Sequence, residues 1–380
     1  MENCWDVFHL DGENGFRGGE RQLLYLAAAL RAGGHRNTVV CRRDSPLEAQ
    51  SRALGLATKS LPFLAEWDPI SAWKLARAAR RARRPVLHAH TGHAAALASL
   101  AGSWGRLPWV AHRRVDFDIN GYLSRRLKYG RAGRVVAVSG AISDIMARAG
   151  IPRARIAVVA DGLPINAQEC AWADMPADRF SIPSPSERSR LRRNICEGFG
   201  VPKDALWIGN LAALVPHKDH DTLLAAALLT LRSKPQAVFL IAGKGPEESR
   251  LIKQIKLMGL TGQVFILGHM PEPASLLKSL DLFVLSSWGE GMGSVLLEAA
   301  ACGIPIAATA AGGIPEVVED GRTGLLTPPR QPEALAEAIV RLLGDDALAR
   351  KLAAQARENL AHFGLERMAR QMEDIYESIA

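Results

Sequence analysis

Two carboxylates interrupt an otherwise apolar stretch near residue 300, and they are the side chains there best suited to binding chemistry. Glu290 lies in a turn that also holds Gly289, Gly291 and Gly293. Glu298 lies among leucines and alanines, where an ionised side chain costs free energy unless it has partners. On spacing alone Glu298 could instead be an exposed helix residue, and that alternative stays open at this point.

The elements around these carboxylates form half of a β-α-β unit. Residues 282–285 are apolar and of strand length, residues 286–293 form the turn, and residues 294–302 have the length of a short helix. Gly303 and Pro305 are typical of a helix end. The first amides of such a helix have no partner within it and face the space beyond the strand, which suits an anion.

Five short motifs follow one another through this part of the chain. They are Glu-Gly-Met-Gly (290–293), Leu-Glu-Ala (297–299), Gly-Ile-Pro (303–305), Gly-Gly-Ile-Pro-Glu-Val-Val (312–318) and Asp-Gly-Arg-Thr-Gly-Leu-Leu (320–326). The series closely resembles the C-terminal signature of retaining GT-B glycosyltransferases of family 4. In that family the first glutamate contacts hydroxyls of the donor sugar and the second holds the ribose of the nucleotide. The resemblance gives the first, catalytic role to Glu290 and the second to Glu298.

The resemblance extends to other positions that bind the donor nucleotide. It implies that Gly18 and Gly19, followed by Glu20, lie over the donor diphosphate, and that Lys218 grips the same group. The remaining donor-binding residues that it implies are Gly243, Gly245, His269, Met270, Gly291, Met292, Gly293 and Ser294. His269 and Met270 would hold the base through backbone groups.

Family members often place a histidine near the transferred sugar, in the loop after a strand of the first domain. His112 is the nearest candidate for this catalytic position. Counting from Pro108 puts Arg114 there instead, so the chain departs from the family pattern at this point.

A second departure concerns the diphosphate. The family pattern Gly-Arg-Leu is replaced here by Ala212-Ala213-Leu214, so Ala213 stands where the family has an arginine. One charge-assisted hydrogen bond to a phosphate contributes about 1.5–3 kcal/mol. Its loss must be offset by another cation, for which Arg17 is a candidate by position, or be accepted as weaker donor binding.

Three other patterns raise metal or dinucleotide chemistry. His88, His90 and His93 lie at and after a predicted strand, but His93 lies past a turn and no fourth ligand is apparent. Residues 116–118 (Asp-Phe-Asp) resemble a metal-binding motif of a different transferase fold, and we interpret them as a loop. The glycines of residues 12–19 do not form GxGxxG. We therefore expect no metal and no cofactor, with a nucleotide-diphosphate sugar as co-substrate.

The charge of the chain is divided unevenly. The net charge is +8, but residues 1–165 carry a net +12 and the remainder −4. Residues 71–84 form a predicted helix with six basic residues, whose simplest interpretation is a solvated face. Basic surfaces attract nucleic acid, anionic lipid or acidic substrates. Because the basic stretches lack interleaved aromatics and no nucleic-acid-binding module appears, we expect no nucleic acid partner and consider an anionic membrane surface instead.

The sequence also bears on the compartment. The N-terminal residues 1–15 are acidic and polar, unlike a signal peptide. The most apolar window, residues 295–311, is too short to span a bilayer. Five cysteines form no CxxC pair, which favours reduced thiols. We expect a cytoplasmic protein that can be peripheral on the cytoplasmic face of the membrane.

Strand, loop and helix alternate along both halves of the chain. This predicts two Rossmann-like, doubly wound parallel sheets facing a cleft, which is the GT-B fold of the family. We expect an acceptor-binding domain over 1–165, a linker over 166–200, a nucleotide-sugar-binding domain over 201–364, and a helix over 365–380 that crosses back to the first domain.

The resemblance implies a retaining glycosyltransferase of the hexosyltransferase type. Its acceptor would be a glycan or a lipid-linked acceptor, in lipopolysaccharide, glycolipid or other cell-surface polysaccharide synthesis. A nucleotide-sugar epimerase of the same fold would share Glu290 and Glu298 but would bind a second nucleotide sugar, and it would convert UDP-N-acetylglucosamine alone into an epimer. A non-catalytic or nucleic-acid-binding protein remains a further alternative, made conceivable by Ala213 and by the basic half.

Overall fold

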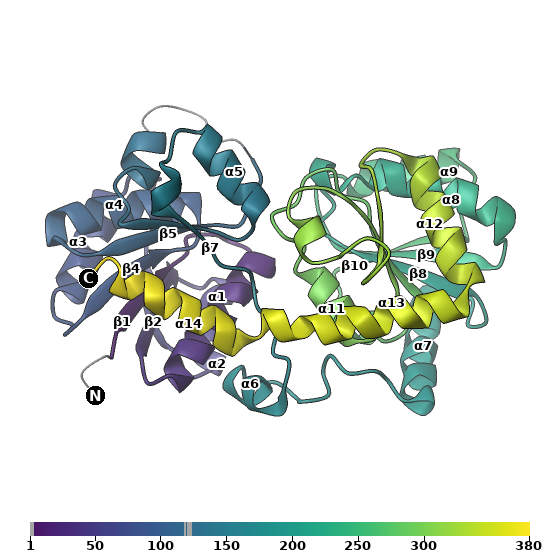
Figure 1. Cartoon of the computed structure of the whole chain (residues 1–380), viewed down its shortest axis with the longest axis horizontal. Coiled ribbons are helices and arrows are strands. Elements are labelled where there is room, and N and C mark those ends of the chain that lie inside the picture. The colour runs from purple at the N-terminus through teal and green to yellow at the C-terminus, as the bar shows by residue number, and fades with distance from the viewer. Residues whose placement is uncertain (1–3, 118, 120–123) are drawn as a thin grey trace. The chain divides into compact units, whose positions relative to one another are not determined.

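The computed structural model describes residues 4–117, 119 and 124–380, and the chain divides into two compact units. Unit 1 comprises residues 1–176 and 362–380, and unit 2 comprises residues 177–361. Each unit is a parallel sheet with helices packed on its faces (Figure 1). The predicted pair of doubly wound parallel sheets is therefore confirmed.

The sheet of unit 1 has the strand order β3-β2-β1-β4-β5-β6-β7, and every neighbouring pair is parallel. Its strands are β1 (Asp6–Leu10), β2 (Arg36–Arg42), β3 (Ala57–Leu61), β4 (Pro85–Ala89), β5 (Trp109–Arg113), β6 (Arg134–Ala137) and β7 (Ile156–Val158). The central strands β1 and β4 are almost fully buried, as a sheet covered on both faces requires. Their register places His9 beside His88.

The helices of unit 1 are α1 (Gly18–Ala32), α2 (Pro46–Ala53), α3 (Pro69–Ala79), α4 (Gly92–Gly105), α5 (Gly140–Arg148), α6 (Ala167–Trp172) and α14 (Leu365–Glu377). The C-terminal helix α14 packs on the sheet and on α1 through Leu365, Met368, Met372 and Tyr376. Residues from the beginning and the end of the chain therefore share one core, and Figure 1 shows α14 beside α1.

The sheet of unit 2 has the order β10-β9-β8-β11-β12-β13, again parallel throughout. Its strands are β8 (Leu206–Leu211), β9 (Ala237–Ala242), β10 (Val264–Gly268), β11 (Leu282–Leu285), β12 (Ile306–Thr309) and β13 (Leu325–Thr327). Its helices are α7 (Pro185–Phe199), α8 (His220–Ser233), α9 (Glu248–Leu257), α10 (Pro273–Leu277), α11 (Val295–Ala301), α12 (Pro332–Gly344) and α13 (Asp346–Asn359).

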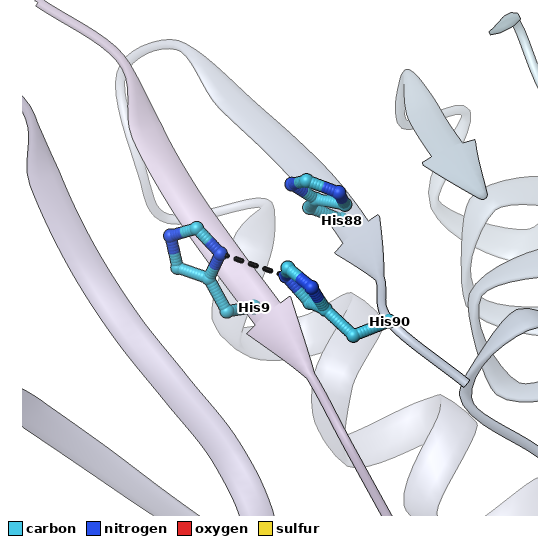
Figure 2. A group of neighbouring side chains, drawn as sticks. All are labelled: His9, His88 and His90. Carbon is cyan, nitrogen blue, oxygen red and sulfur yellow. Dashed lines mark hydrogen bonds between the residues drawn. The ribbon is translucent and has the colours of Figure 1, made fainter. Parts of the chain in front are cut away.

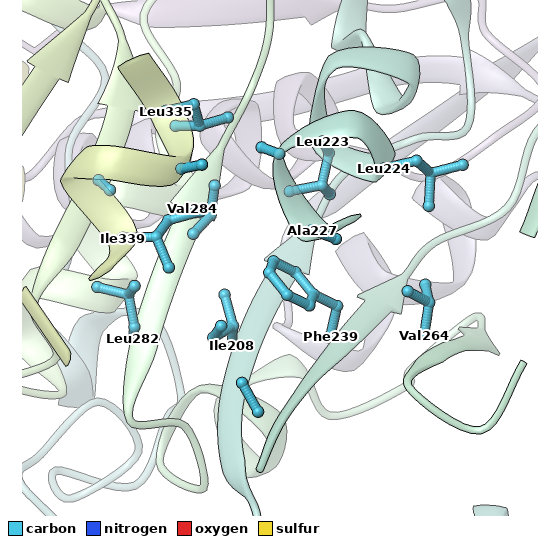
Figure 3. Close-up of a cluster of buried hydrophobic side chains, with 14 of the residues drawn as sticks. Ile208, Leu223, Leu224, Ala227, Phe239, Val264, Leu282, Val284, Leu335 and Ile339 are labelled. Carbon is cyan, nitrogen blue, oxygen red and sulfur yellow. The ribbon is translucent and has the colours of Figure 1, made fainter. Parts of the chain in front are cut away.

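The core of unit 2 forms where α8 and α12 cover the central strands (Figure 3). Phe239 and Ile208 from the sheet meet Leu223 of α8, and Val284 meets Ile339 of α12. Burial of these side chains fixes β8 and β11 as neighbours, so the turns that follow these two strands leave the same edge of the sheet.

Several sequence predictions differ from the structure in detail. Helix α1 begins at Gly18, so the glycine pair expected over the diphosphate forms the first turn of a helix. The basic helix ends at Ala79, because residues 80–84 turn away before Pro85, and a residue before proline disfavours helix. His112 lies in β5 and not in the loop after it. Of the predicted loop over 116–118, residue 118 lies outside the described residues.

None of the helices in the described part of the chain combines the length and the apolar character needed to cross a membrane.

Candidate functional site

The turns after β8 and β11 meet at the carboxyl edge of the unit 2 sheet. Lys218 Nζ forms an ion pair with Glu290 Oε2, and Ser287 Oγ lies 3.2 Å from the same carboxylate oxygen. The side chains of Lys218 and Glu290 are only 16% and 12% exposed. The structure therefore brings together two of the predicted site residues from segments 72 positions apart in the sequence.

Hydrogen bonds to backbone carbonyls hold these two turns against each other. Ser286 Oγ donates to the Lys218 carbonyl at 3.0 Å, and the amide of Trp288 donates to the His217 carbonyl at 3.0 Å. The indole of Trp288 adds a hydrogen bond to the Pro216 carbonyl at 3.1 Å. The Lys218–Glu290 pair therefore sits on a fixed frame rather than on two independent loops.

A glycine lets a third segment close on Glu290. Gly312 has a φ of +52°, and a Cβ placed on it would lie 1.9 Å from the Glu290 carbonyl oxygen. The amide of Gly313 donates to that carbonyl at 3.1 Å. Only glycine fits this approach without moving the backbone of Glu290, which explains why the motif at 312–318 belongs to the site.

Gly243 and Gly245 act in the same way on the loop that holds Ala213. A Cβ on Gly243 would lie 1.8 Å from the Ala212 carbonyl oxygen, and one on Gly245 would lie 2.2 Å from the Leu214 carbonyl oxygen. The amide of Leu214 donates to the Lys244 carbonyl at 3.0 Å. These two predicted residues therefore shape the loop before Lys218, and whether they also touch a nucleotide stays a prediction.

Glu298 lies in the first turn of α11 and is 5% exposed, so the exposed alternative left open by its spacing is wrong. Gly291, Met292 and Gly293 are buried in the turn before it, with Gly293 at a φ of +79°, and Ser294 is half-buried as the cap residue of α11.

His269 is exposed and Met270 is half-buried, directly after the edge strand β10. Their predicted role in holding a base through backbone groups stays a prediction.

In unit 1 the predicted glycine pair opens α1. Gly18 and Gly19 are its first residues, and Glu20 Oε2 accepts a hydrogen bond from the Arg17 amide at 2.6 Å. Glu20 is buried and caps the N-terminus of the helix, so its role is structural. A Cβ on Gly19 would meet nothing within 4 Å, so the fold itself does not require glycine there.

A cluster of buried histidines lies at the carboxyl ends of β1, β4 and β5. Figure 2 shows His9 on β1 and His88 and His90 at the end of β4, with His9 Nδ1 3.1 Å from His90 Nε2. Arg114 Nη1 lies 2.9 Å from His90 Nδ1, and Arg114 Nε donates to Asp161 Oδ1 at 2.8 Å. His93, which the sequence grouped with His88 and His90, is exposed on α4, and His9 takes its place.

The hydrogen-bond directions in this cluster follow from Arg114. A guanidinium can only donate, so His90 Nδ1 accepts and His90 Nε2 carries the proton that it donates to His9 Nδ1. His9 Nε2–H then donates to Asn37 Oδ1 at 2.9 Å. A continuous chain of polar groups thus runs from Asp161 to Asn37.

A second chain ties the cluster to the C-terminal helix. His88 Nδ1 lies 2.7 Å from the Tyr376 hydroxyl on α14, and His88 Nε2 lies 3.3 Å from His112 Nδ1. His112 is 3% exposed, and its Nε2 has no hydrogen-bond partner among the described residues. Nε2 is therefore the ring nitrogen of His112 that could contact a sugar, and this contact stays a prediction.

Comparison with known proteins identifies the family. Residues 192–359 match the model described as "Glycosyl transferases group 1", and residues 16–166 match "Glycosyltransferase Family 4". The chain belongs to the family 4 glycosyltransferases. The family suggested by the motifs from Glu290 to Leu326 is thereby confirmed.

Relatives of this family 4 chain cover it only in part. The N-acetyl-alpha-D-glucosaminyl L-malate synthase of Bacillus anthracis is 36% identical over 151 residues, which are 40% of each chain. The D-inositol 3-phosphate glycosyltransferase of Streptomyces bingchenggensis is 30% identical over 313 residues, 79% of this chain and 62% of that protein. The chain thus matches about half the length of these two curated relatives.

A solved structure matches the whole chain. HepE of Anabaena, in complex with UDP and glucose, superposes with a TM-score of 0.84 at 22% identity and covers 98% of this chain and 99% of its own. This likeness shows the fold, and the predicted GT-B fold is confirmed.

Burial keeps the four clustered histidines of this family 4 protein neutral. It lowers the pKa of His9 to about 4, and it lowers the pKa of His88, His90 and His112 well below the usual value, with the neighbouring Arg114 adding to the effect. Burial and the nearby Glu20 raise the pKa of Asp11, which follows β1, to about 7.

Geometry alone would also allow a metal ion at this cluster. Ring nitrogens of His9, His88 and His90 lie within 4.8 Å of one another. Against this, the hydrogen bonds just described already use these ring nitrogens, and the guanidinium of Arg114 contacts His90 where a second cation would be repelled. The expectation of no metal stays a prediction.

Sequence reasoning missed several residues of both clusters. Ser287 was seen only as part of a turn, and His9 and Tyr376 gave no local signal, because strand register and the packing of a C-terminal helix bring them in. Asn210 was also missed; its Nδ2 donates to the Val284 carbonyl at 2.9 Å while its Oδ1 is buried without a partner among the described residues.

Proposed function

We propose that this protein is a retaining glycosyltransferase that moves a sugar from a nucleotide-diphosphate sugar to an acceptor. The Lys218–Glu290 pair at the carboxyl edge of the unit 2 sheet carries the proposal. One partner offers a cation for a diphosphate and the other offers a carboxylate for sugar hydroxyls. Ligands of doubly wound sheets bind at this edge. The likeness to HepE, a protein solved with UDP and glucose, supports a nucleotide sugar as donor.

The chemistry needs positive charge where the nucleoside diphosphate leaves. Lys218 supplies one fixed charge, with the turn over residues 291–294 beside it. Glu290 orients the sugar, whose transition state has the oxocarbenium character known for glycoside cleavage. We assign Glu298 to the ribose. We name no protein nucleophile and propose that neither a metal nor another cofactor takes part.

The acceptor in this proposal is a glycan or a lipid-linked molecule of the cell surface, and the reaction takes place on the cytoplasmic side of the membrane. The net charge of +12 over residues 1–165 supports this choice, because a basic domain is attracted to anionic lipid head groups. We propose no nucleic acid partner.

Two substitutions test the donor site. Glu298→Ala should weaken nucleotide binding in calorimetry with UDP or GDP, whereas Glu290→Ala should mainly lower turnover in a donor-hydrolysis assay. Glu337→Ala, on helix α12 away from the turns, is the matched control. Wild-type behaviour of both Glu290 and Glu298 variants in both assays would reject the site.

A further inference from the structure

A large apolar patch is exposed on unit 1. The side chains of Trp73 and Trp104 are 55% and 47% exposed, and that of Ile70 is 51% exposed. Together with Pro69 they line a groove of about 410 Å³ between α3 and α4, helices that pack side by side (Figure 1). Exposed apolar patches of this kind are typical of interaction sites.

Packing of the fold does not account for this patch. The inward face of α3 is already complete, with Ala72, Leu75, Ala76 and Ala79 buried. Ile70 and Trp73 lie one turn apart on the opposite, outer face of the helix. The helix start is held by Asp68, whose carboxylate accepts from the amides of residues 70 and 71.

The same outer face is strongly basic. Arg77 continues the spacing of Ile70 and Trp73 along the helix, Arg81 follows just after the helix end, and both are exposed. The Arg77 guanidinium lies 5.5 Å from the centre of the Trp73 ring. A second groove joins the tryptophans to Arg77, Arg80 and Arg81. Residues 69–84 and residues 92–106 contain no aspartate or glutamate, so no acidic residue within either segment neutralises the face.

We infer that this face of α3 and α4 docks on a bilayer surface that contains anionic lipid. The tryptophans enter the interfacial layer, where an aromatic ring with a polar N–H is most stable, and the arginines bind lipid phosphates. The proposal deepens the membrane-side acceptor proposed above by naming the surface that reaches the lipid. Docking itself requires neither the donor site nor the acceptor.

Charge and composition favour a bilayer over a second copy of the chain. The face combines two exposed tryptophans with guanidinium groups on one helix side, which is the composition of interfacial anchors. A second copy of the chain would bring an equally basic face into contact with it and would be repelled. The structure corrects one point of the sequence analysis here, since Trp73 and Trp104 do place aromatic rings among the basic residues.

Vesicle flotation tests the inference with the full-length protein and with no nucleotide or acceptor present. Wild type should bind phosphatidylcholine vesicles that contain phosphatidylglycerol, bind vesicles without it much less, and lose binding as salt rises. Trp73→Ala/Trp104→Ala should reduce partitioning about tenfold or more, through the lost apolar contact. Arg77→Glu/Arg81→Glu should also reduce partitioning, by about fivefold for each basic group removed, because the attraction to anionic lipid is lost. Arg77→Lys/Arg81→Lys keeps both positive charges and should bind nearly as wild type.

Matched controls lie on unit 2. Arg190→Glu/Arg193→Glu on α7 makes the same charge change at exposed positions, and Phe199→Ala/Leu257→Ala removes exposed apolar side chains of similar kind. Both should bind vesicles as wild type does, and melting curves should show that all variants fold.

Three results would overturn the inference. They are wild-type binding that is indifferent to phosphatidylglycerol, a loss of binding in the unit 2 controls equal to that in the patch variants, and a dimer that Trp73→Ala/Trp104→Ala converts to monomer. Failure of nucleotide binding in the Glu298 experiment would leave vesicle binding unaffected, so the two proposals fail separately.

Discussion

At the scale of single residues, the site in unit 2 rests on a cation and an anion that neutralise each other. Lys218 and Glu290 form an ion pair that is mostly shielded from water, so both charges are fixed in place. A ligand that carries both phosphates and hydroxyls can satisfy each partner separately. The ion pair therefore keeps the Lys218 amine in position for a ligand, and neither charge is left unpaired in a mostly buried turn.

Removing the amine should mainly weaken binding of the diphosphate. Lys218→Ala should lower the affinity for UDP or GDP by about tenfold to one-hundredfold, because a hydrogen bond to a charged group contributes about 1.5–3 kcal/mol and Ala213 offers no second cation. Calorimetry measures this directly. Lys253→Ala, an exposed lysine on α9, is the control, and equal affinities for the two variants would contradict the assignment.

Gly19 separates a requirement of the fold from a requirement of the ligand. A Cβ at this position meets nothing in the structure, and alanine is favoured over glycine inside a helix by about 0.5–1 kcal/mol. Gly19→Ala should therefore keep or raise the melting temperature, yet lower donor affinity if a diphosphate approaches this backbone. A variant that is both more stable and as active as wild type would remove Gly19 from the site.

Gly243→Ala is the opposite case. Its Cβ would collide with the Ala212 carbonyl, so a loss of activity there would come with a loss of stability and would say nothing about a ligand. Comparing the two variants separates a glycine that the fold requires from a glycine that nucleotide binding requires.

At the scale of elements, a short apolar run in the sequence predicts a buried central strand correctly. The strand predicted over 282–285 agrees with the structure to the residue, because it is a short apolar run followed by turn residues. Strand β3 and helix α2 were missed, since Ala57–Leu61 is half polar and lies at the sheet edge. Edge strands lack the continuous apolar run that identifies a central one.

The histidine cluster could not be read from spacing for a different reason. His88 and His90 were visible at a strand end, but their partner is His9, which strand register supplies from a segment about 80 residues earlier. The tempting local neighbour, His93, turned out to be exposed. Residues brought together by parallel strand order leave no local trace in the sequence.

Helix α14 connects to this cluster through one hydroxyl. Tyr376→Phe keeps the ring in its buried site but leaves His88 Nδ1 without its 2.7 Å partner. An unsatisfied buried polar atom costs about 1–3 kcal/mol, so the melting temperature should fall by several degrees. The melting temperature of wild type is the reference. Equal melting temperatures for Tyr376→Phe and wild type would show that the hydroxyl contributes nothing.

At the scale of the whole molecule, the two units differ in their buried titratable groups. Unit 1 contains the four buried histidines, whereas in the described part of unit 2 only His220 has a lowered pKa, of about 4, owing to burial and to Lys218. Asp11 and Asp161 of unit 1 shift the other way, since burial raises the pKa of both carboxyls.

Acid should therefore destabilise unit 1 before unit 2. In the unfolded chain a histidine titrates near pH 6.5, but His9 in the folded unit has a pKa of about 4. Between these values the unfolded chain binds a proton that the folded unit does not, so stability falls as the pH falls. At pH 5 this costs about 2 kcal/mol for His9 alone.

The carboxylates work against this trend without reversing it. Asp11 has a pKa of about 7 in the folded unit, whereas an unfolded aspartate loses its proton above about pH 4. Lowering the pH between these values therefore stabilises the folded unit at Asp11. The gain in free energy is about as large as the loss at one histidine. The four histidines together outweigh it. Hydrogen exchange with mass spectrometry at pH 7 and pH 5, corrected for intrinsic rates, should show protection lost first in the strands of unit 1.

His9→Gln gives this prediction its sharpest form. The amide can still accept from His90 and donate to Asn37, but it does not titrate, so the loss of protection on going from pH 7 to pH 5 should shrink by about 2 kcal/mol. His93→Gln, at the exposed histidine of α4, should leave the pH dependence unchanged. Earlier loss of protection in unit 2, or an unaltered pH dependence in His9→Gln, would show that the buried histidines do not govern the acid response.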